Sequence, residues 1–104
     1  EGEPEETLMR PSQALEKHRE AIREILSQYP VSNPRVFGSV SRGEDTETSD
    51  LDIIVKSQKG LDYYVLFRAE DEIGAVTGVK VDLRLDGEFS PRVLRRIERD
   101  FIAL

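Results

Sequence analysis

The sequence predicts an α+β domain in which a small mixed β-sheet is flanked by helices. Segments 51–56 and 79–85 have the apolar runs or the alternation of β-strands. Segments 12–28, 61–74 and the stretch after Ser90 have helical spacing or helix-start signals. The 104 residues are enough for one domain with one hydrophobic core. Helices and strands therefore alternate within a single unit, without internal repeats or long linkers.

The first helix is predicted over residues 12–28, with Ser12 as its N-cap. Its apolar residues follow helical spacing, with charged residues between them: Leu15, Ile22, Ile25 and Leu26. We expect the helix to end at Tyr29, because the residue before a proline avoids the helical region. Residues 32–34 are then predicted to form a loop.

Two strands separated by a polar loop come next. Residues 35–37 predict a short strand that leads into Gly38, and the polar residues 42–50 predict a loop. In the strand 51–56, alternation places Leu51, Ile53 and Val55 on one face and Asp50, Asp52 and Ile54 on the other. Because both faces carry apolar residues, we expect both to be at least partly covered.

The second half of the chain adds a helix, a strand and a final helix. Residues 61–74 are interpreted as a helix, with a strand over residues 63–67 as the open alternative. Residues 79–85 alternate cleanly and end in the Asp86-Gly87 turn. Ser90 and Pro91 are typical of a helix start, and the apolar stripe of this last helix includes Leu94, Ile97 and Phe101.

Composition excludes several kinds of site. The chain has no cysteine, which rules out disulfides and thiolate metal sites. The available metal ligands are oxygens and the single His18, which favours hard ions such as Mg²⁺. No apolar run approaches the roughly 20 residues that span a bilayer. No secretory signal pattern is evident either, so we expect a cytoplasmic protein.

Residues 1–8 differ in character from the rest of the chain. We interpret them as an expression-tag remnant, Met9 as the natural start and residues 9–104 as the single domain. Removing the four glutamates of this segment (Glu1, Glu3, Glu5 and Glu6) changes the net charge from −6 to −2. Overall acidity is therefore no guide to partners, and no basic field indicates nucleic-acid binding.

Three aspartates are the candidate metal ligands. Asp50 and Asp52 are two residues apart, so a strand would project both from one face, where a divalent cation relieves their repulsion. Asp52 also interrupts an apolar run, in which an isolated carboxylate is costly without a partner. Asp82 converges with them if strand 79–85 neighbours strand 51–56. The alternative is that these carboxylates are merely solvated.

The Gly38-Ser39 pair is a candidate phosphate turn. Glycine permits close approach of a ligand to the backbone, and turn amides together with the Ser39 hydroxyl can bind phosphate oxygens. The alternative is an ordinary turn that ends a strand. Arg42 can pair either with a phosphate or with a loop acid, of which the candidates are Glu44, Asp45 and Glu47.

Three other groups have weaker signals. Lys80 and Arg84 share the face of Asp82 and are interpreted as exposed strand cations, with phosphate neutralisation as the alternative. Tyr63 and Tyr64 are expected in core or partner contacts, with base stacking as the alternative. The arginines of the last helix are expected to form a solvated face that could dock a partner: Arg92, Arg95, Arg96 and Arg99.

The spacing from Gly38-Ser39 to Asp50-x-Asp52, with Arg42-Gly43 inside it and Asp82 on a later strand, resembles the DNA polymerase β-like nucleotidyltransferase superfamily. The resemblance covers about residues 35–85. Within that superfamily the chain is similar to the minimal nucleotidyltransferases, several of which are antitoxins paired with a helical RNase toxin of the HEPN class. Ser41 replaces the alanine that is common in the family pattern, and both residues are small.

The resemblance implies transfer of AMP from ATP. Asp50 and Asp52 would bind one or two Mg²⁺ ions and, through them, the triphosphate. Asp82 would complete the metal site and help deprotonate the attacking hydroxyl. Gly38 and Ser39 would hold a terminal phosphate, with Arg42 nearby. In the antitoxin subgroup, the acceptor would be a tyrosine hydroxyl of the HEPN-type toxin.

Two alternative functions stay open. The chain could neutralise its partner by complex formation alone, with a vestigial nucleotide site, since a small domain has little room for an acceptor pocket. It could also modify a small molecule or an RNA end, which the missing second domain and the absence of a basic field disfavour.

Overall fold

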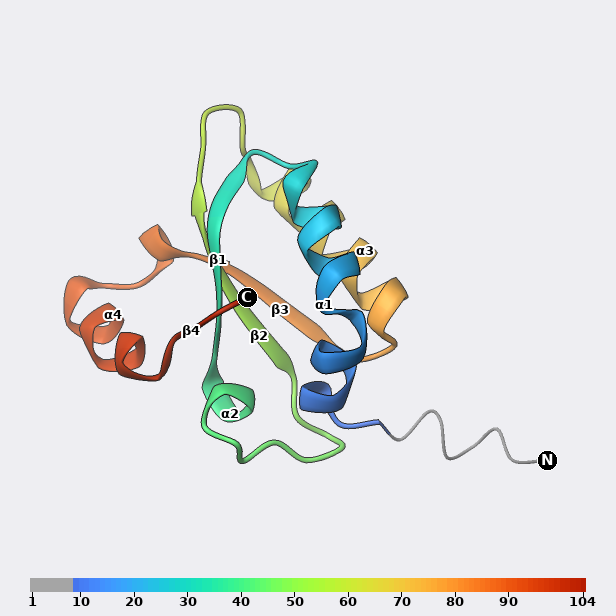
Figure 1. Cartoon of the computed structure of the whole chain (residues 1–104). Helices are drawn as coiled ribbons and strands as arrows, with labels where there is room; N and C mark the ends of the chain where they lie inside the picture. Colours follow the sequence, from blue (N-terminus) through green and yellow to red (C-terminus); the bar gives the residue numbers. More distant parts are fainter. Residues whose placement is uncertain (1–8) are drawn as a thin grey trace.

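The computed structural model describes residues 9–104, so the predicted tag remnant at residues 1–8 lies outside the described residues (Figure 1). The elements in chain order are α1 (Pro11–Ser27), β1 (Val31–Phe37), α2 (Gly38–Ser41), β2 (Leu51–Ser57), α3 (Tyr63–Thr77), β3 (Val81–Leu85), the 3₁₀ turn η2 (Asp86–Glu88), α4 (Pro91–Ile97), the 3₁₀ turn η3 (Glu98–Asp100) and β4 (Ile102–Ala103). Among the described residues, no helix has the length and apolar character needed to cross a membrane.

The four strands form one mixed sheet in the order β3-β2-β1-β4. β1 is antiparallel to both β2 and β4, whereas β2 and β3 are parallel. Parallel neighbours require a crossover connection, and α3 supplies it between β2 and β3. The predicted α+β class, with a small mixed sheet flanked by helices, is confirmed.

The hydrophobic core lies between the sheet and the paired helices α1 and α3, which cover one face (Figure 1). Leu51, Ile53 and Val55 of β2 belong to this core, as the alternation predicts. The opposite face carries Asp52 and Ile54, and Ile54 is also fully buried. Residues 86–101, which contain α4, lie on that second side of the sheet, and the chain then joins the sheet as β4 (Figure 1). β2 is therefore covered on both faces over part of its length.

The C-terminal segment is attached to the second face by aromatic and ionic contacts. The ring of Phe37 meets the edges of Phe89 and Phe101 at centroid distances of 6.1 and 6.2 Å. Arg35 donates to Asp86 at 2.8 Å, and its guanidinium lies 4.9 Å from the Phe101 ring centroid. Edge-to-face rings and a cation over a ring are both attractive arrangements. These contacts leave the end of β2 that carries Asp52 as the partly open part of this face.

The N-cap prediction at Ser12 is wrong. α1 begins at Pro11, with Arg10 at the cap position, and the backbone N–H of Ser12 donates to the Asp45 carboxylate at 2.8 Å. Proline suits the first helical position because its missing N–H would have no partner there. A loop carboxylate supplies the acceptor for the next N–H, which is also favourable at the positive end of a helix. A cap 33 residues away has no local sequence signal.

The predicted loop at residues 32–34 is instead part of β1. The register between β1 and β2 shifts between Ser32 and Arg35, and Asn33 has a φ of 52°. Such an irregularity accommodates Pro34, which has no N–H to donate to a ladder. The carbonyl of Pro34 accepts from Leu104 at 3.1 Å, next to the two residues of β4. The bulge therefore lets a proline lie within a strand.

Two further boundaries differ from the predictions. α3 is a helix, so the strand alternative over residues 63–67 is wrong, and the helix extends to Thr77 before Gly78 ends it with a φ of 75°. The last helix ends at Ile97, and the chain then turns and adds β4 beside β1. Sheet pairing overrides the helical spacing at Phe101, which packs against Phe37 from a non-helical position.

Edge strand β3 is protected by a side chain of α3. The N–H of Leu83 donates to Glu70 at 2.8 Å. Edge strands with open N–H groups invite pairing with other chains.

We expect Glu70→Ala to reduce the free energy of unfolding, measured in urea, by about 1 kcal/mol, because the N–H of Leu83 loses its acceptor. Glu70→Gln, which keeps an oxygen, should lose less, and the exposed Asp71→Ala is the control. Equal losses for Glu70→Ala and Asp71→Ala would exclude this role.

Candidate functional site

Asp52 and Asp82 lie side by side because of strand register. The parallel ladder pairs Asp52 of β2 with Asp82 of β3. The antiparallel ladder pairs Phe37, at the end of β1, with the same Asp52. β3 is thus the neighbour of β2, which is the condition for Asp82 to join the site. Asp50 immediately precedes β2, which begins at Leu51 as the sequence predicts.

Gly38 brings the end of β1 against the Asp52 carboxylate. Gly38 has a φ of 75°, which is in the region that favours glycine. A Cβ at Gly38 would overlap an Asp52 carboxylate oxygen and lie only 3.0 Å from Asp52 Cγ. The turn after Gly38 is the short helix α2, and Val40 anchors it in the core. The turn and the carboxylate therefore touch, and only glycine allows that contact.

The small side chains of α2 have different environments. The Ser41 hydroxyl donates to the Gly38 carbonyl at 2.9 Å, so the serine that replaces the family alanine closes this turn. The Ser39 carbonyl accepts from Glu44 at 2.9 Å. Within residues 9–104, no hydrogen bond engages the Ser39 hydroxyl, and the residue is partly exposed. The hydroxyl is thus available to a ligand.

Arg42 pairs with a loop acid in this structure. Its Nε donates to Glu44 at 3.1 Å, and a terminal nitrogen lies 3.9 Å from Asp100. Both pairs are partly exposed and hence weak. Asp45, another predicted partner, is buried and instead caps α1. The pairing of Arg42 with Glu44 is compatible with exchange for a phosphate.

The electrostatics of the site centre on Asp52. Burial first, and then the negative charges of Asp82 and Asp50, raise the pKa of Asp52 from 3.8 to about 6. Arg84 and Arg42 act in the opposite direction. A partly buried carboxylate next to like charges is a site where a cation is strongly favoured. The charges of the two neighbouring aspartates therefore act on the Asp52 carboxylate.

This pKa shift predicts a pH dependence of stability. The folded state holds a proton on Asp52 up to about pH 6, whereas the unfolded chain releases it near pH 4. Asp52 therefore reduces the free energy of unfolding as pH rises from 4 to 7. We expect Asp52→Asn to match wild type near pH 4 and to exceed it by about 1 kcal/mol at pH 7, after allowance for solvent screening. Urea titrations without divalent cations test this, and a constant difference would refute it.

Arg84 is a neighbour of the candidate site, and the sequence does not reveal its contacts. Its position predicts an exposed strand cation, but its Nε donates to Asp82 at 3.1 Å and its NH1 to Glu88 at 3.0 Å. Asp82 and Arg84 are two residues apart on one strand, so strand alternation predicts that their side chains share a face. The contact of Arg84 with Glu88 depends on how η2 folds back toward β3, and no local sequence pattern predicts it.

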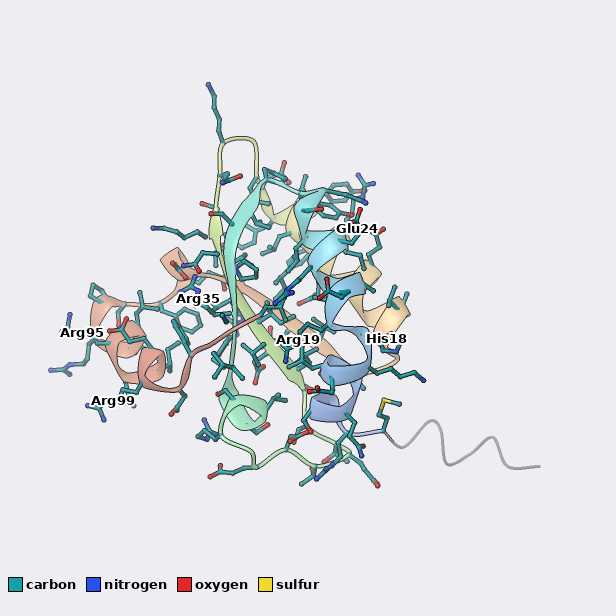
Figure 2. All side chains as sticks on the ribbon, viewed as in Figure 1. His18, Arg19, Glu24, Arg35, Arg95 and Arg99 are labelled. Atoms are coloured by element: carbon teal, nitrogen blue, oxygen red, sulfur yellow. The ribbon has the colours of Figure 1, made fainter. Side chains whose placement is uncertain are left out.

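Carboxylate oxygens are suitable ligands for a hard cation, although the three aspartates do not form a ready cluster in this structure. Among the described residues, no three His, Cys, Asp or Glu side chains converge closely enough to form a ready metal site. Asp82 is directed to Arg84 instead. Oxygen donors, crowded like charges and the raised pKa of Asp52 fit Mg²⁺. His18 lies on α1, the helix that covers the other face of the sheet (Figure 2).

Other hollows lie away from these aspartates. A cavity of about 710 Å³ between the end of α1 and α3 is lined by Tyr29, Arg68 and Glu72 among others, and Tyr29 donates to Glu72 at 2.6 Å. A hollow of about 540 Å³ is lined by Glu98 and the arginines Arg92, Arg95, Arg96 and Arg99. Arg95 and Arg99 extend away from the sheet (Figure 2). The expected exposed basic face of the last helix is thus present.

Several known proteins are similar to this chain in sequence. Residues 15–104 match the family described as nucleotidyltransferase domain. A candidate protein adenylyltransferase of Methanocaldococcus jannaschii is 38% identical over 89 residues, which cover 85% of this chain and 88% of the relative. A second from that organism is 33% identical over 97 residues, covering 92% and 96%. Protein adenylyltransferase MntA of Thermococcus cleftensis is 28% identical over 88 residues, covering 85% and 86%.

Solved structures share the fold. A structure described as a candidate minimal nucleotidyltransferase has a TM-score of 0.81 at 32% identity and covers 89% of this chain and 95% of its own. A chain of a toxin–antitoxin crystal structure with AMP-PNP has a TM-score of 0.71 at 21% identity, covering 81% and 69%, which shows a shared fold. The family match over residues 15–104 and the M. jannaschii relatives place this chain in the nucleotidyltransferase family, and it is an enzyme of that family.

Proposed function

We propose that this chain transfers AMP from ATP to a tyrosine hydroxyl of a cognate HEPN-type toxin, and thereby acts as an antitoxin. The observation that carries the proposal is the register of Asp52 with Asp82, next to a glycine turn that touches Asp52. Relatives named as protein adenylyltransferases support a protein acceptor. A fold neighbour from a toxin–antitoxin structure with AMP-PNP agrees with an adenine nucleotide and a toxin partner.

Asp50, Asp52 and Asp82 would hold one or two Mg²⁺ ions. Their oxygen donors, and the like charges that raise the pKa of Asp52, support this assignment. Bound there, Mg²⁺ would supply charge stabilisation for the attacking and leaving oxygens of an in-line displacement. At neutral pH, Asp52 is ionised in most molecules, since its pKa of about 6 lies below 7.

Gly38, Ser39 and Arg42 would bind the phosphates. The partly exposed Ser39 and the backbone of α2 lie next to Asp52 through the Gly38 contact. Arg42 would exchange its weak pair with Glu44 for a phosphate oxygen. These contacts would orient the triphosphate along the row of carboxylates.

The acceptor hydroxyl would attack the α-phosphorus of ATP. A new phosphorus–oxygen bond forms, the bond to the β-phosphate breaks, and pyrophosphate leaves. Asp82 would take the proton of the hydroxyl, because its carboxylate lies beside Asp52 in the same row. Positioning supplies most of the acceleration in such phosphoryl transfers. The partner would bring the hydroxyl to the open end of the sheet.

The decisive experiment uses labelled ATP, Mg²⁺ and the product of the neighbouring gene. We expect the label of α-³²P-ATP to appear on a tyrosine of that partner, and a variant carrying both Asp50→Asn and Asp52→Asn to transfer none. Equal labelling by the double variant would refute the mechanism. Labelling of a small hydroxylated acceptor or an RNA end without any protein partner would instead identify a different substrate class.

A second candidate is an antitoxin that acts by binding alone. It is favoured by the engagement of Asp82 with Arg84 and by three exposed aromatic residues at the start of α3: Tyr63, Tyr64 and Phe67. An exposed aromatic patch is typical of an interaction surface. Rescue of toxin-expressing cells by the double Asn variant would support this candidate, and failure of rescue would exclude it.

A further inference from the structure

Arg84 is shared between Asp82 of the candidate metal site and Glu88 of η2. Its Nε donates to Asp82 at 3.1 Å and its NH1 to Glu88 at 3.0 Å. Hydrogen bonds to Glu88 and then to Asp82 raise the pKa of Arg84, so the guanidinium stays charged at all physiological pH values. A single fixed cation therefore bridges a candidate metal ligand and a second carboxylate.

The two halves of this bridge differ in strength. Glu88 is 17% exposed, whereas Asp82 is 35% exposed, and solvent weakens the more exposed pair. The second carboxylate oxygen of Glu88 is held by the N–H of Leu85 at 3.2 Å. The Phe89 ring, 5.8 Å from the guanidinium carbon, adds a further contact on the η2 side. The contacts thus hold Arg84 at Glu88 more firmly than at Asp82.

We propose that Arg84 is a positioning residue that neutralises Asp82 until a divalent cation binds, and that Glu88 retains the guanidinium when Asp82 releases it. The inference rests on the metal site of the proposed function. Asp82 can direct its oxygens either to Arg84 or to a cation. Asp50 and Asp82 both repel the Asp52 carboxylate, and the guanidinium of Arg84 offsets part of this negative charge. Glu88 sets how readily Asp82 becomes free.

The test measures binding of Mn²⁺ alone, by calorimetry and by the EPR signal of free Mn²⁺, without nucleotide. We expect Arg84→Met to lower the Kd for Mn²⁺ by roughly three- to tenfold, because Asp82 loses its competing cation. Arg84→Lys should give an intermediate Kd, since an ammonium has no fork to bridge two carboxylates. The exposed Arg95→Met is the matched control for loss of one positive charge, with an expected change below about twofold.

The Glu88→Gln variant distinguishes a shift of the Arg84 guanidinium between Asp82 and Glu88 from a general effect of charge. It should raise the Kd about threefold in the presence of Arg84, because the guanidinium then favours Asp82, and have little effect in the Arg84→Met background. Equal effects of Glu88→Gln in both backgrounds, or equal Kd values for Arg84→Met and Arg95→Met, would overturn the inference. If Asp52→Asn abolishes binding while Arg84→Met leaves it unchanged, only the role of Arg84 fails. If neither wild type nor Arg84→Met binds Mn²⁺, the metal site and the inference both fail.

Discussion

Asp52→Asn should reduce AMP transfer by about a hundred- to thousandfold while the fold persists. Asp52 is the one aspartate in register with Asp82 and in contact with the Gly38 turn. Asparagine has nearly the same shape, yet it removes the charge that would attract a cation and orient the triphosphate. Single-turnover transfer of labelled AMP to the partner measures the loss.

Two controls separate chemistry from folding in this prediction. Circular dichroism and urea unfolding should show a variant at least as stable as wild type at pH 7, since Asp52 is partly buried beside like charges. Asp71→Asn, on the exposed side of α3, should transfer AMP at the wild-type rate. A stable Asp52→Asn protein with unchanged transfer would remove Asp52 from the active site.

Gly38→Ala should destabilise the protein by about 2–3 kcal/mol and also impair transfer. An alanine at a φ of 75° costs about 1 kcal/mol or more by itself. The remainder arises because the new Cβ overlaps the Asp52 carboxylate, which must move or lose its place beside Asp82. Urea unfolding gives the first quantity, and the rate of AMP transfer gives the second.

Gly43→Ala is the matched control. Gly43 has a φ of 72°, close to that of Gly38, but no atom lies within 4 Å of a Cβ built there. It should therefore show only the backbone cost, about 1 kcal/mol. In an Asp52→Ala background, Gly38→Ala should cost less than in wild type, because most of the overlapping atoms are gone. A loss for Gly38→Ala no greater than that for Gly43→Ala would show that the contact with Asp52 is unimportant.

The structure also affects how the surface of the last helix is interpreted. Four arginines extend from α4 and η3 on the side of the sheet that carries the site, yet none of the ion pairs among the described residues involves them. They are Arg92, Arg95, Arg96 and Arg99. The ionic contacts that attach this segment to the sheet come instead from Arg35 and Arg84. Strand arginines therefore hold the segment through its acidic side chains Asp86 and Glu88, whereas the four arginines of the segment stay in solvent.

Much of the candidate site follows from the sequence. The period of two along a strand puts Asp82 and Arg84 on one face and separates Asp52 from the core residues Leu51 and Ile53, as the structure shows. The Gly-Ser pair after a short strand predicts the turn at α2. These are local relations, set by backbone geometry over a few residues, so they can be predicted without knowledge of the packing.

Only the tertiary structure decided how these local pieces meet. Pairing of Asp52 with Asp82 requires the parallel register of β2 and β3, which the crossover through α3 determines. The cap that Asp45 provides for α1 joins residues 33 positions apart, and β4 pairs with β1 from the far end of the chain. Such contacts depend on which surfaces become buried together, because a polar group shielded from water must find whatever partner the packing brings. The sequence by itself therefore determined the carboxylates, the glycine turn and their faces. Packing decided their register and the bridging of Asp82 to Glu88 by Arg84.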